Sequence, residues 1–273
     1  MKERLERTLA DIAPQDPAWR ARARARLDQL TMPHWALGRL MDLAEDLAGM
    51  TRSLNPPVAR RAVVTFAADH GVVAEGVSRF PQAVTPQMVR NFVAGGAGIN
   101  ALAAVARARV VVVDMGVAED LADLVRAGSV VGRRIGPGTR NMAVGPAMSR
   151  DEALRALLAG IELARELAPG TDLFGTGDMG IGNTTPSAAI AAVMTGQSLE
   201  NVTGRGTGID DAQLSRKRAV IARALRVNQP RAEDGLDVLS KVGGFEIGGI
   251  AGLILGAAAA RKPVLVDGFI STA

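Results

Sequence analysis

Apolar runs that alternate with helical stretches are the feature that most constrains the fold of this chain. Runs typical of buried strands lie at residues 61–69 and 110–117, around residues 130 and 173, and at residues 201–204 and 263–269. Stretches typical of helices separate them, at residues 86–106, 150–167, 186–194, 211–227 and 245–260. Strands that are apolar throughout and alternate with helices are typical of parallel sheets covered on both faces. The sequence therefore predicts an α/β fold with a parallel sheet and helices on both faces.

The N-terminal residues have a different pattern, which predicts helices only. Leu5, Leu9 and Ile12 share one face of a first helix, and prolines at positions 14 and 17 are expected to end it. Two further helices are expected at residues 19–30 and 35–50. We therefore divide the chain into a helical part, residues 1–55, and an α/β catalytic part, residues 56–273.

Composition excludes several kinds of site and partner. The chain has no cysteine and two histidines, so we expect neither disulfides nor a metal site. Its net charge is +4, and the arginines of residues 20–26 alternate with alanine without stacking aromatics, so no nucleic-acid partner is expected. The N-terminus has no apolar signal core, and the most apolar stretch, residues 247–260, is too short to span a bilayer comfortably. We expect a soluble, cytoplasmic protein without a membrane partner.

Polar and glycine-rich segments follow several of the expected strands. They are Asp69-His70-Gly71, Asp114-Met115-Gly116, residues 175–185, residues 204–211 and Asp267-Gly268. In parallel sheets of this kind, ligands bind beyond the carboxyl ends of the strands. The segments therefore predict a binding site at that edge of the sheet.

The segment TDLFGTGDMGIGNTTPSAAI, residues 171–190, is expected to bind an anion. Its glycines let the backbone approach a ligand closely, Thr184 or Thr185 is a suitable N-cap, and Pro186 suits the first position of a helix. The free amides and positive dipole end of that helix favour phosphate. A glycine-rich turn that only packs strand against helix is the alternative.

The same segment also matches the dinucleotide fingerprint, at Gly175, Gly177 and Gly180, with Glu200 downstream. The match is weak because the capping residues come several positions later than in a true fingerprint. No glycine run is followed by Gly-Lys-Ser or Gly-Lys-Thr, so a P-loop is absent.

A second glycine-rich loop, residues 204–211, precedes a helix that carries Ser215-Arg216-Lys217-Arg218. Its backbone amides and the ammonium of Lys217 could together hold a phosphate. The alternative is a basic helix face that is simply solvated.

Taken together, these segments resemble the nicotinate-nucleotide–dimethylbenzimidazole phosphoribosyltransferase family, which makes the lower-ligand nucleotide of cobalamin. The similar stretches are FAADHGVVAEGVSRFPQAVTPQMV, VVDMGV, GTRNMA, GDMGIGNTTPSAAI, TGRGTGIDD with the following Lys217, VGGFEIGGIAGLILGAA and PVLVDGFISTA, and they cover most of residues 61–273. The resemblance implies transfer of the phosphoribosyl group of nicotinate mononucleotide to 5,6-dimethylbenzimidazole, giving α-ribazole 5′-phosphate and nicotinate. It also implies a Rossmann-like sheet with a small helical domain made from both chain ends, a homodimer, and no metal or other cofactor.

The resemblance also implies two groups of site residues. Those expected at the phosphate and ribose are Asp178, Met179, Gly180, Ile181, Gly182, Asn183, Thr184, Thr185, Gly204, Gly206, Thr207, Gly208 and Lys217. Those expected at the benzimidazole pocket are Asp69, His70, Ser78, Phe80, Pro81 and Gln82. Asp178 stands where members of the family often have the longer Glu.

The expected reaction replaces one base at C1′ of a ribose by another. Because the leaving group is already a pyridinium, it departs without a general acid, whereas the attacking benzimidazole must lose a proton, for which a carboxylate is the natural acceptor. In the family this glutamate follows the DGFISTA segment, where this chain ends at Ala273. We therefore expect a shortened chain that lacks the usual base and turns over slowly or not at all.

Glu246 is a candidate substitute for that base, as are Asp69 and Asp178 at strand ends. The alternative for Glu246 is a first-turn carboxylate that the helix dipole favours. Two other functions stay open: a dinucleotide-dependent oxidoreductase, and a nucleotide-binding module without turnover.

Overall fold

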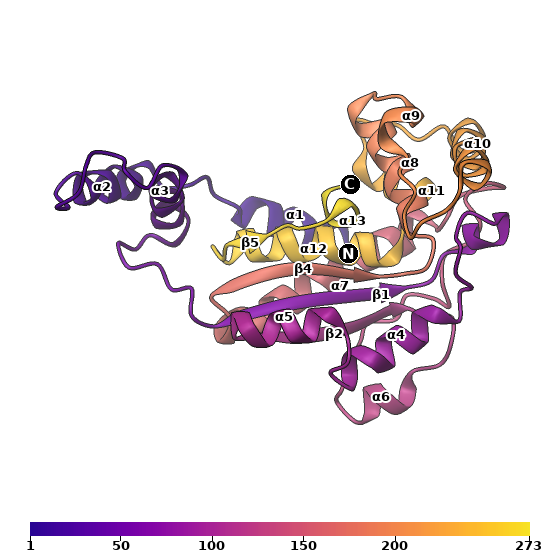
Figure 1. Cartoon of the computed structure of the whole chain (residues 1–273), viewed down its shortest axis with the longest axis horizontal. Helices are drawn as coiled ribbons and strands as arrows, with labels where there is room; N and C mark the ends of the chain where they lie inside the picture. Colours follow the sequence, from indigo (N-terminus) through magenta and orange to yellow (C-terminus); the bar gives the residue numbers. More distant parts are fainter.

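The computed structural model describes residues 1–273 and has a five-stranded sheet at its centre (Figure 1). Its strands are β1 (Arg61–Ala68), β2 (Ala108–Gly116), β3 (Val131–Gly132), β4 (Leu173–Met179) and β5 (Val264–Leu265), in the spatial order β3-β2-β1-β4-β5. All neighbouring strands are parallel; Val63 of β1, for example, lies between Val110 of β2 and Gly175 of β4. The predicted parallel α/β sheet is thus confirmed.

Helices cover both faces of the sheet, as the apolar strands require. One face carries α12 (Phe245–Ala259) and α7 (Arg150–Leu167), and the other carries α4 (Val84–Val93) and α5 (Gly98–Ala106) (Figure 1). The remaining helices are α1 (Lys2–Asp11), α2 (Pro17–Leu27), α3 (Arg39–Thr51), α6 (Ala122–Arg126), α8 (Thr184–Thr195), α9 (Leu199–Val202), α10 (Asp211–Asn228), α11 (Gly235–Val242) and α13 (Phe269–Thr272), with single 3-10 turns at Gly71–Glu75 and Ala168–Gly170.

The main core lies between the sheet and α12, where Phe66, Phe174 and Phe245 are buried. A smaller core under α4 contains Val89 and Phe92. With few aromatics in the chain, helices must approach one another closely to fill space. Helices α7 and α12 do so through glycines: a Cβ atom on Gly252 would lie 1.9 Å from the carbonyl oxygen of Leu157.

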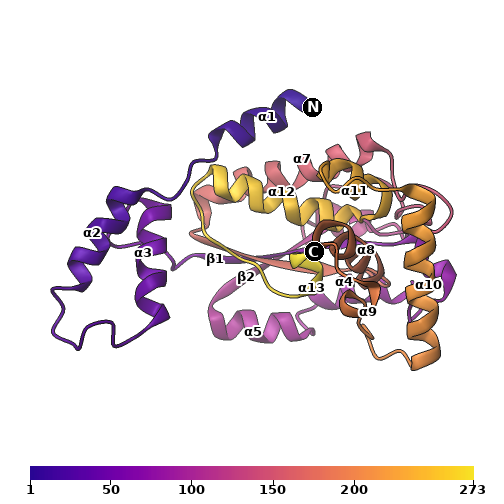
Figure 2. The ribbon, with the colours of Figure 1, turned by 90° about the horizontal axis from the view of Figure 1, so that it is seen from above.

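The N-terminal helices take two different positions. Helix α1 packs on α7 and α12, whereas α2 and α3 pair with each other as a hairpin that stands apart from the sheet (Figure 2). The buried carboxylate of Glu45 joins them, because it pairs with Arg24 and Arg20. The division into residues 1–55 and 56–273 stays a prediction.

Several expected elements differ in the structure. Residues 86–106 form two helices instead of one, since Gly95 adopts a left-handed conformation with φ of +79°. The expected strand at residues 201–204 is wrong: residues up to 202 belong to α9. The strand expected at residues 263–269 shrinks to β5 and is followed by α13. Pro17 does not end a helix but opens α2, which Asp16 caps through the amides of Ala18 and Trp19.

Residues Val84–Ala106 are long and apolar enough to cross a membrane by length and composition, with a mean hydropathy of 1.2. In the structure they are α4 and α5, which pack against the sheet. Apolar helices that cover a sheet meet the same criteria of length and composition, so this stretch is weak evidence for a membrane segment.

Candidate functional site

The carboxyl ends of β1 and β4 meet at one edge of the sheet. Asp69 and His70 follow β1 directly, and Gly180 follows β4. The two ends touch, because a Cβ atom on Gly180 would lie 2.4 Å from the carbonyl oxygen of Ala68. Only glycine fits there, so the turn after β4 lies directly against the end of β1.

Helix α8 begins at this edge, two residues earlier than the sequence suggested. Its N-cap is Asn183, whose side chain makes no capping hydrogen bond, so the expected caps Thr184 and Thr185 are wrong. The hydroxyl of Thr184 instead accepts a hydrogen bond from Lys217 Nζ at 2.6 Å. The amides of Gly182 and Thr184 donate to no group of the protein. The start of α8 therefore keeps donors for an anion.

The loop before α10 reaches the same point. Gly206 has φ of +53°, and a Cβ atom on it would lie 3.2 Å from Thr184 Oγ1 and 3.6 Å from Lys217 Nζ. The amides of Gly206 and Thr207 also donate to no protein group. Helix α10 is fixed at its start by Asp210, which caps it in a capping box with Gln213. The predicted loop, helix start and lysine thus come together at one place.

Lys217 is a buried cation without a carboxylate partner. It is 1% exposed and is the one Lys or Arg among the buried residues. Burial lowers the pKa of its ammonium to about 8, and Thr184 Oγ1 is its hydrogen-bond acceptor. A buried, unpaired ammonium is costly unless an anion accompanies it. This cation and the free amides around it are suited to a phosphate.

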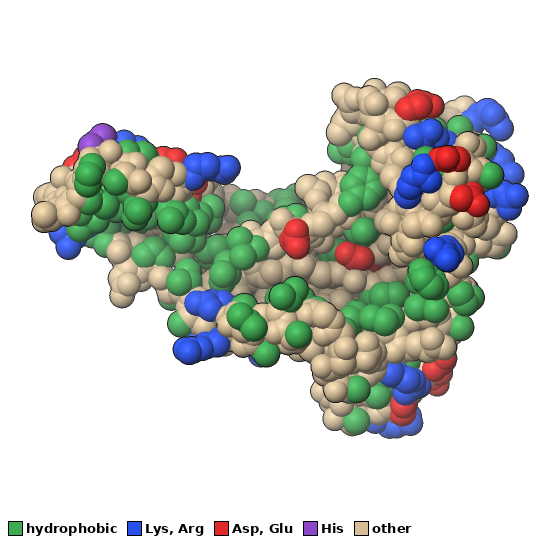
Figure 3. Space-filling view, viewed as in Figure 1, with side chains coloured by type: hydrophobic (Ala, Val, Ile, Leu, Met, Phe, Trp, Pro, Cys, Tyr) green, Lys and Arg blue, Asp and Glu red, His purple; other side chains and the backbone are tan.

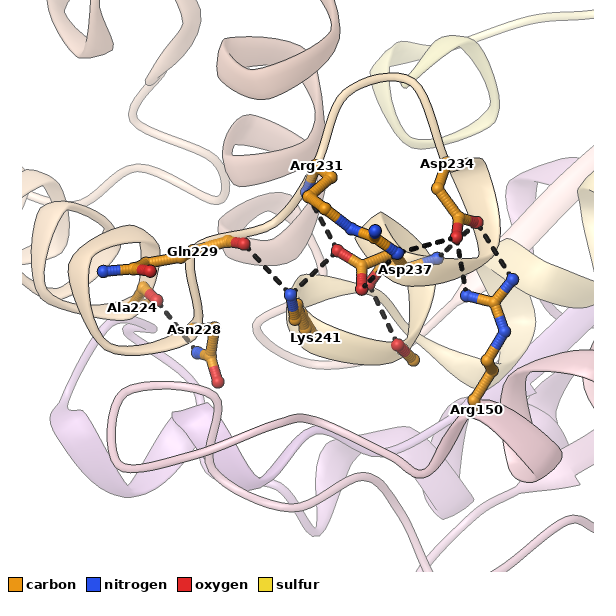
Figure 4. A network of polar contacts seen from close by, with 9 residues as sticks. Arg150, Ala224, Asn228, Gln229, Arg231, Asp234, Asp237 and Lys241 are labelled. Carbon is orange, nitrogen blue, oxygen red and sulfur yellow. Dashed lines mark hydrogen bonds and ion pairs between the residues drawn. The ribbon is translucent and has the colours of Figure 1, made fainter.

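Helix α10 is anchored behind this point by a polar network (Figure 4). Lys241 of α11 donates to Asp237 at 2.9 Å and to the carbonyl oxygen of Gln229 at 3.0 Å. Arg150 of α7 pairs with Asp234 at 2.9 Å. These contacts fix the connection from α10 to α11, at the end of α10 that lies away from Lys217.

Asp178, near the end of β4, lies beside the same turn. Its Oδ2 accepts a hydrogen bond from Asn183 Nδ2 at 2.8 Å. Burial raises the pKa of the Asp178 carboxyl, and the nearby charge of Glu246 raises it further. Asp178 is nevertheless only partly buried, unlike the carboxylates behind it. Figure 3 shows acidic side chains in the hollow between the α2–α3 hairpin and the α8–α10 group.

His70 and Glu246 lie behind the rim. Their Nε2 and Oε1 atoms are 2.7 Å apart, and the residues are 1% and 0% exposed. Glu246, the candidate substitute for the base, lies in the first turn of α12 and is fully buried. It therefore does not reach a base bound at the surface.

The residues expected at the benzimidazole pocket separate into two groups. Asp69 is fully buried with Oδ2 on the amide of Ala118, and His70 is buried as described. Ser78, Phe80, Pro81 and Gln82 lie in the segment before α4, where Phe80 is 44% exposed. The amide of Phe80 donates to Ser78 Oγ at 3.2 Å.

Thr85 connects that segment to the glycine turn and was not identified from the sequence. Its hydroxyl accepts a hydrogen bond from the amide of Ile181 at 3.1 Å. A single buried threonine before a proline carries no sequence signal for such a contact. The base-pocket segment and the phosphate loop are thus joined through Thr85.

The dinucleotide fingerprint has a structural explanation instead. Gly175 and Gly177 lie inside β4, where a Cβ atom on Gly177 would meet the hydroxyl of Thr65 at 2.8 Å. They serve strand packing and do not form a phosphate loop. Glu200 lies in the short helix α9.

A separate apolar cavity of about 400 Å³ opens between α8, α11, α12 and α13. Its lining is almost entirely aliphatic, with Ile190, Leu239 and Ile254 among the side chains. It offers no charged group for a nucleotide, so the site at the strand ends remains the candidate.

Comparisons with known proteins point in one direction. A family described as phosphoribosyltransferase matches residues 12–273. The nicotinate-nucleotide–dimethylbenzimidazole phosphoribosyltransferase of Syntrophotalea carbinolica is 64% identical over 98% of this chain and 76% of its own length, and that of Desulfotalea psychrophila is 59% identical over the same shares. The crystal structure of CobT from Thermus thermophilus is similar with a TM-score of 0.88 and 49% identity, over 94% of this chain and 76% of that one.

Proposed function

The chain belongs to the nicotinate-nucleotide–dimethylbenzimidazole phosphoribosyltransferase family, and we propose that it carries out the transfer that names the family. It moves the phosphoribosyl group of nicotinate mononucleotide to 5,6-dimethylbenzimidazole, which gives α-ribazole 5′-phosphate and nicotinate. The single observation that supports this most strongly is the unpaired ammonium of Lys217 beside the start of α8. The reaction belongs to the synthesis of the lower ligand of cobalamin.

In this proposal the 5′-phosphate binds where Lys217, the α8 amides and the loop at Gly206 meet. The phosphate does not take part in the bond exchange, so its binding energy is available to orient the sugar. Thr184 fixes the ammonium, and the glycines let the backbone reach the anion. The site thus holds the nucleotide by the end that stays unchanged.

Negative charge also lies at this edge of the sheet. Asp178 is a partly buried carboxylate, and Asp69 and Glu246 lie behind it. During the reaction positive charge develops on the ribose as the pyridinium leaves, and fixed negative charge nearby stabilises it. The substrate has the same polarity, with an anionic phosphate at one end and a cationic ring nitrogen at the other.

Benzimidazole attacks C1′ through one nitrogen and loses the proton of the other. The new C–N bond forms on the face opposite the departing nicotinate, so the configuration at C1′ inverts from β to α. The raised pKa of Asp178 brings its carboxyl closer to the range in which a carboxylate accepts a proton effectively. Phe80 offers an exposed ring against which a flat azole can stack.

The test is to incubate the chain with nicotinate mononucleotide and dimethylbenzimidazole and to measure α-ribazole 5′-phosphate by liquid chromatography. We expect slowly formed product that depends on both substrates and on Lys217. Calorimetry with the mononucleotide, the azole and NAD separates the other functions. Binding of both substrates without product would indicate a binding module, and binding of NAD alone would indicate the oxidoreductase.

We also propose that the chain forms a homodimer. Large apolar side chains that a monomer leaves in water support this: Leu102 and Val105 of α5 are 69% and 86% exposed, and Leu40 of α3 is 63% exposed. Sedimentation velocity would test the assembly, and a monomer at micromolar concentration would contradict it. The cytoplasmic location stays a prediction.

A further inference from the structure

His70 is the centre of a buried group of charges that the transfer reaction has not yet used. Its Nε2 lies 2.7 Å from Glu246 Oε1, and the charges of Asp69 and Asp178 also act on it. Burial by itself would lower the pKa of His70, but the charge and hydrogen bond of Glu246, with Asp69 and Asp178, raise it overall. The carboxylates around His70 therefore favour the imidazolium over the neutral ring.

The ring of His70 is also in contact with two turns. A Cβ atom on Gly180 would lie 3.2 Å from its Nε2, and one on Gly244 would lie 2.5 Å from its Cε1. Gly180 is the first residue after β4, and Gly244 is the N-cap of α12. The imidazole thus fills the space between the glycine turn of the site and the start of the helix that carries Glu246.

Glu246 has an unsatisfied atom that points to more than packing. Its Oε2 is buried and has no hydrogen-bond partner, and the same holds for Asp69 Oδ1. Glu246 also raises the pKa of Asp178 through its charge. Buried carboxylates with free lone pairs are expensive to maintain, so a purely structural site would be expected to satisfy them.

We propose that His70 and Glu246 are a positioning pair for the transfer reaction. Glu246 holds the imidazolium against Gly180. The imidazolium fixes the position of the backbone at residues 178–183, and its charge favours the ionised form of Asp178 near the ribose. Neither residue touches substrate, and both act through that turn. The inference rests on the proposed function, because the turn matters only if it holds the nucleotide.

The charge state of His70 is the first readout. The chain has two histidines, and the other, His34, is exposed with a 76% accessible side chain. Side-chain nitrogen NMR therefore gives two sets of signals, of which His34 is the internal reference. We expect both ring nitrogens of His70 to carry protons at pH 7, and one to lose its proton in Glu246→Gln, which keeps an acceptor but removes the charge.

Kinetics are the second readout. Glu246→Gln is expected to lower kcat/KM on the order of 10- to 100-fold at pH 7 to 8, since a misplaced turn misaligns the reacting groups. The limb of the pH profile that reports loss of the His70 proton moves to lower pH in Glu246→Gln and disappears in His70→Gln. The double variant, in which two amides can still hydrogen-bond, is expected to cost no more than the worse single variant.

Asp172→Asn is the matched control. Asp172 is 3% exposed and pairs with Arg60 at the opposite end of β4, with Oδ1 2.6 Å from the guanidinium. The Asp172→Asn variant is expected to be less stable, but its lost ion pair is remote from the site, so its pH profile should equal that of the wild type. If Glu246→Gln and His70→Gln behave like this control, with lower Tm but unchanged kcat/KM and pH profile, the positioning role is wrong.

The outcomes also separate this inference from the proposed function. If the wild-type chain neither binds nicotinate mononucleotide in calorimetry nor forms product, the proposed function fails and the positioning role falls with it. If the wild type is active and the variants match Asp172→Asn, only the positioning role fails. Should His70→Gln not fold, Glu246→Gln, which is isosteric with the wild type, gives the same comparison.

Discussion

Lys217 Nζ donates a hydrogen bond to Thr184 Oγ1 at 2.6 Å, across 33 positions of sequence. This contact joins the second turn of α10 to the first residue of α8. It brings an ammonium to the positive end of a helix dipole, where two like charges would repel unless an anion lies between them. The relationship therefore explains why two separate glycine loops are needed for one phosphate.

The pH dependence of nucleotide binding follows from this lysine. In the free chain burial lowers the pKa of Lys217 to about 8, so the ammonium loses its proton above that pH. A bound phosphate favours the charged form and raises the pKa, so binding above pH 8 takes up a proton. We expect affinity for nicotinate mononucleotide to fall as the pH rises above 8. Calorimetry in two buffers of different ionisation enthalpy measures the proton uptake.

Lys217→Met is expected to remove that proton uptake and to weaken binding roughly 10- to 100-fold, as for one charge-assisted hydrogen bond. Lys2→Met removes a lysine whose side chain is 87% exposed and serves as the control. Proton uptake that persists in Lys217→Met would assign the titration to another group.

The Thr184 hydroxyl is expected to matter because it holds the ammonium in place. Thr184→Ser keeps the oxygen and should bind the mononucleotide like the wild type, whereas Thr184→Val should bind it about tenfold more weakly, as for the loss of one hydrogen bond. Thr195→Val is the control in the same helix, since Thr195 is exposed and its hydroxyl bonds only local backbone groups, the carbonyl of Ala191 and the amide of Gln197. Equal binding by Thr184→Ser and Thr184→Val would show that the hydroxyl is not needed.

The strand ends could be predicted from the sequence for a simple physical reason. Parallel strands buried on both faces leave apolar runs, and the run of β1 ends where the polar Asp69 appears, whereas β4 continues through Gly175 and Gly177 to Met179. The start of helix α7 was also predictable, because Ser149 and Glu152 form a capping box before a long amphipathic stretch. Local chemistry was sufficient in these places.

Long-range packing decided what the sequence could not show. The sequence places Glu246 in the first turn of a helix, where the dipole favours a carboxylate, but its partner His70 lies 176 positions away. Thr184, one of the expected caps of α8, was mispredicted for the same reason, because its hydroxyl bonds Lys217, 33 positions away, and not a helix amide. The role of a polar side chain with two possible partners can be assigned only when the partner that is distant in sequence is known.

Phe80 is expected to contribute to binding of the azole and not of the nucleotide. Phe80→Ala should raise the KM for dimethylbenzimidazole about tenfold, since aromatic contacts contribute roughly 0.5–1.5 kcal/mol beyond burial. The KM for nicotinate mononucleotide should change little. Phe269→Ala is the control, because Phe269 is similarly exposed, 41% against 44%, but lies in α13. Steady-state kinetics with each substrate varied in turn measures both KM values. A raised KM for nicotinate mononucleotide instead of dimethylbenzimidazole would contradict the prediction.

Gly252→Ala is expected to destabilise the fold through the contact of α7 with α12. A Cβ atom there would lie 1.9 Å from the carbonyl oxygen of Leu157 and 3.0 Å from Gly160 Cα, and backbone atoms cannot rotate away as side chains do. The two helices must separate, which exposes apolar surface and costs about 3 kcal/mol. For a chain of this size that lowers Tm by roughly 6–12 °C. Calorimetric melting curves measure the change.

Gly98→Ala separates this packing effect from the general effect of replacing a helical glycine. Gly98 opens α5, has no positive φ, and no atom lies within 4 Å of its added Cβ. Alanine there restricts the unfolded chain and favours the helix, so Tm should stay equal or rise slightly. Because α12 also carries Glu246, Gly252→Ala should in addition disturb the His70 signals in NMR, whereas Gly98→Ala should not. Equal melting temperatures for Gly252→Ala and the wild type would mean that α7 and α12 do not approach one another as closely as described.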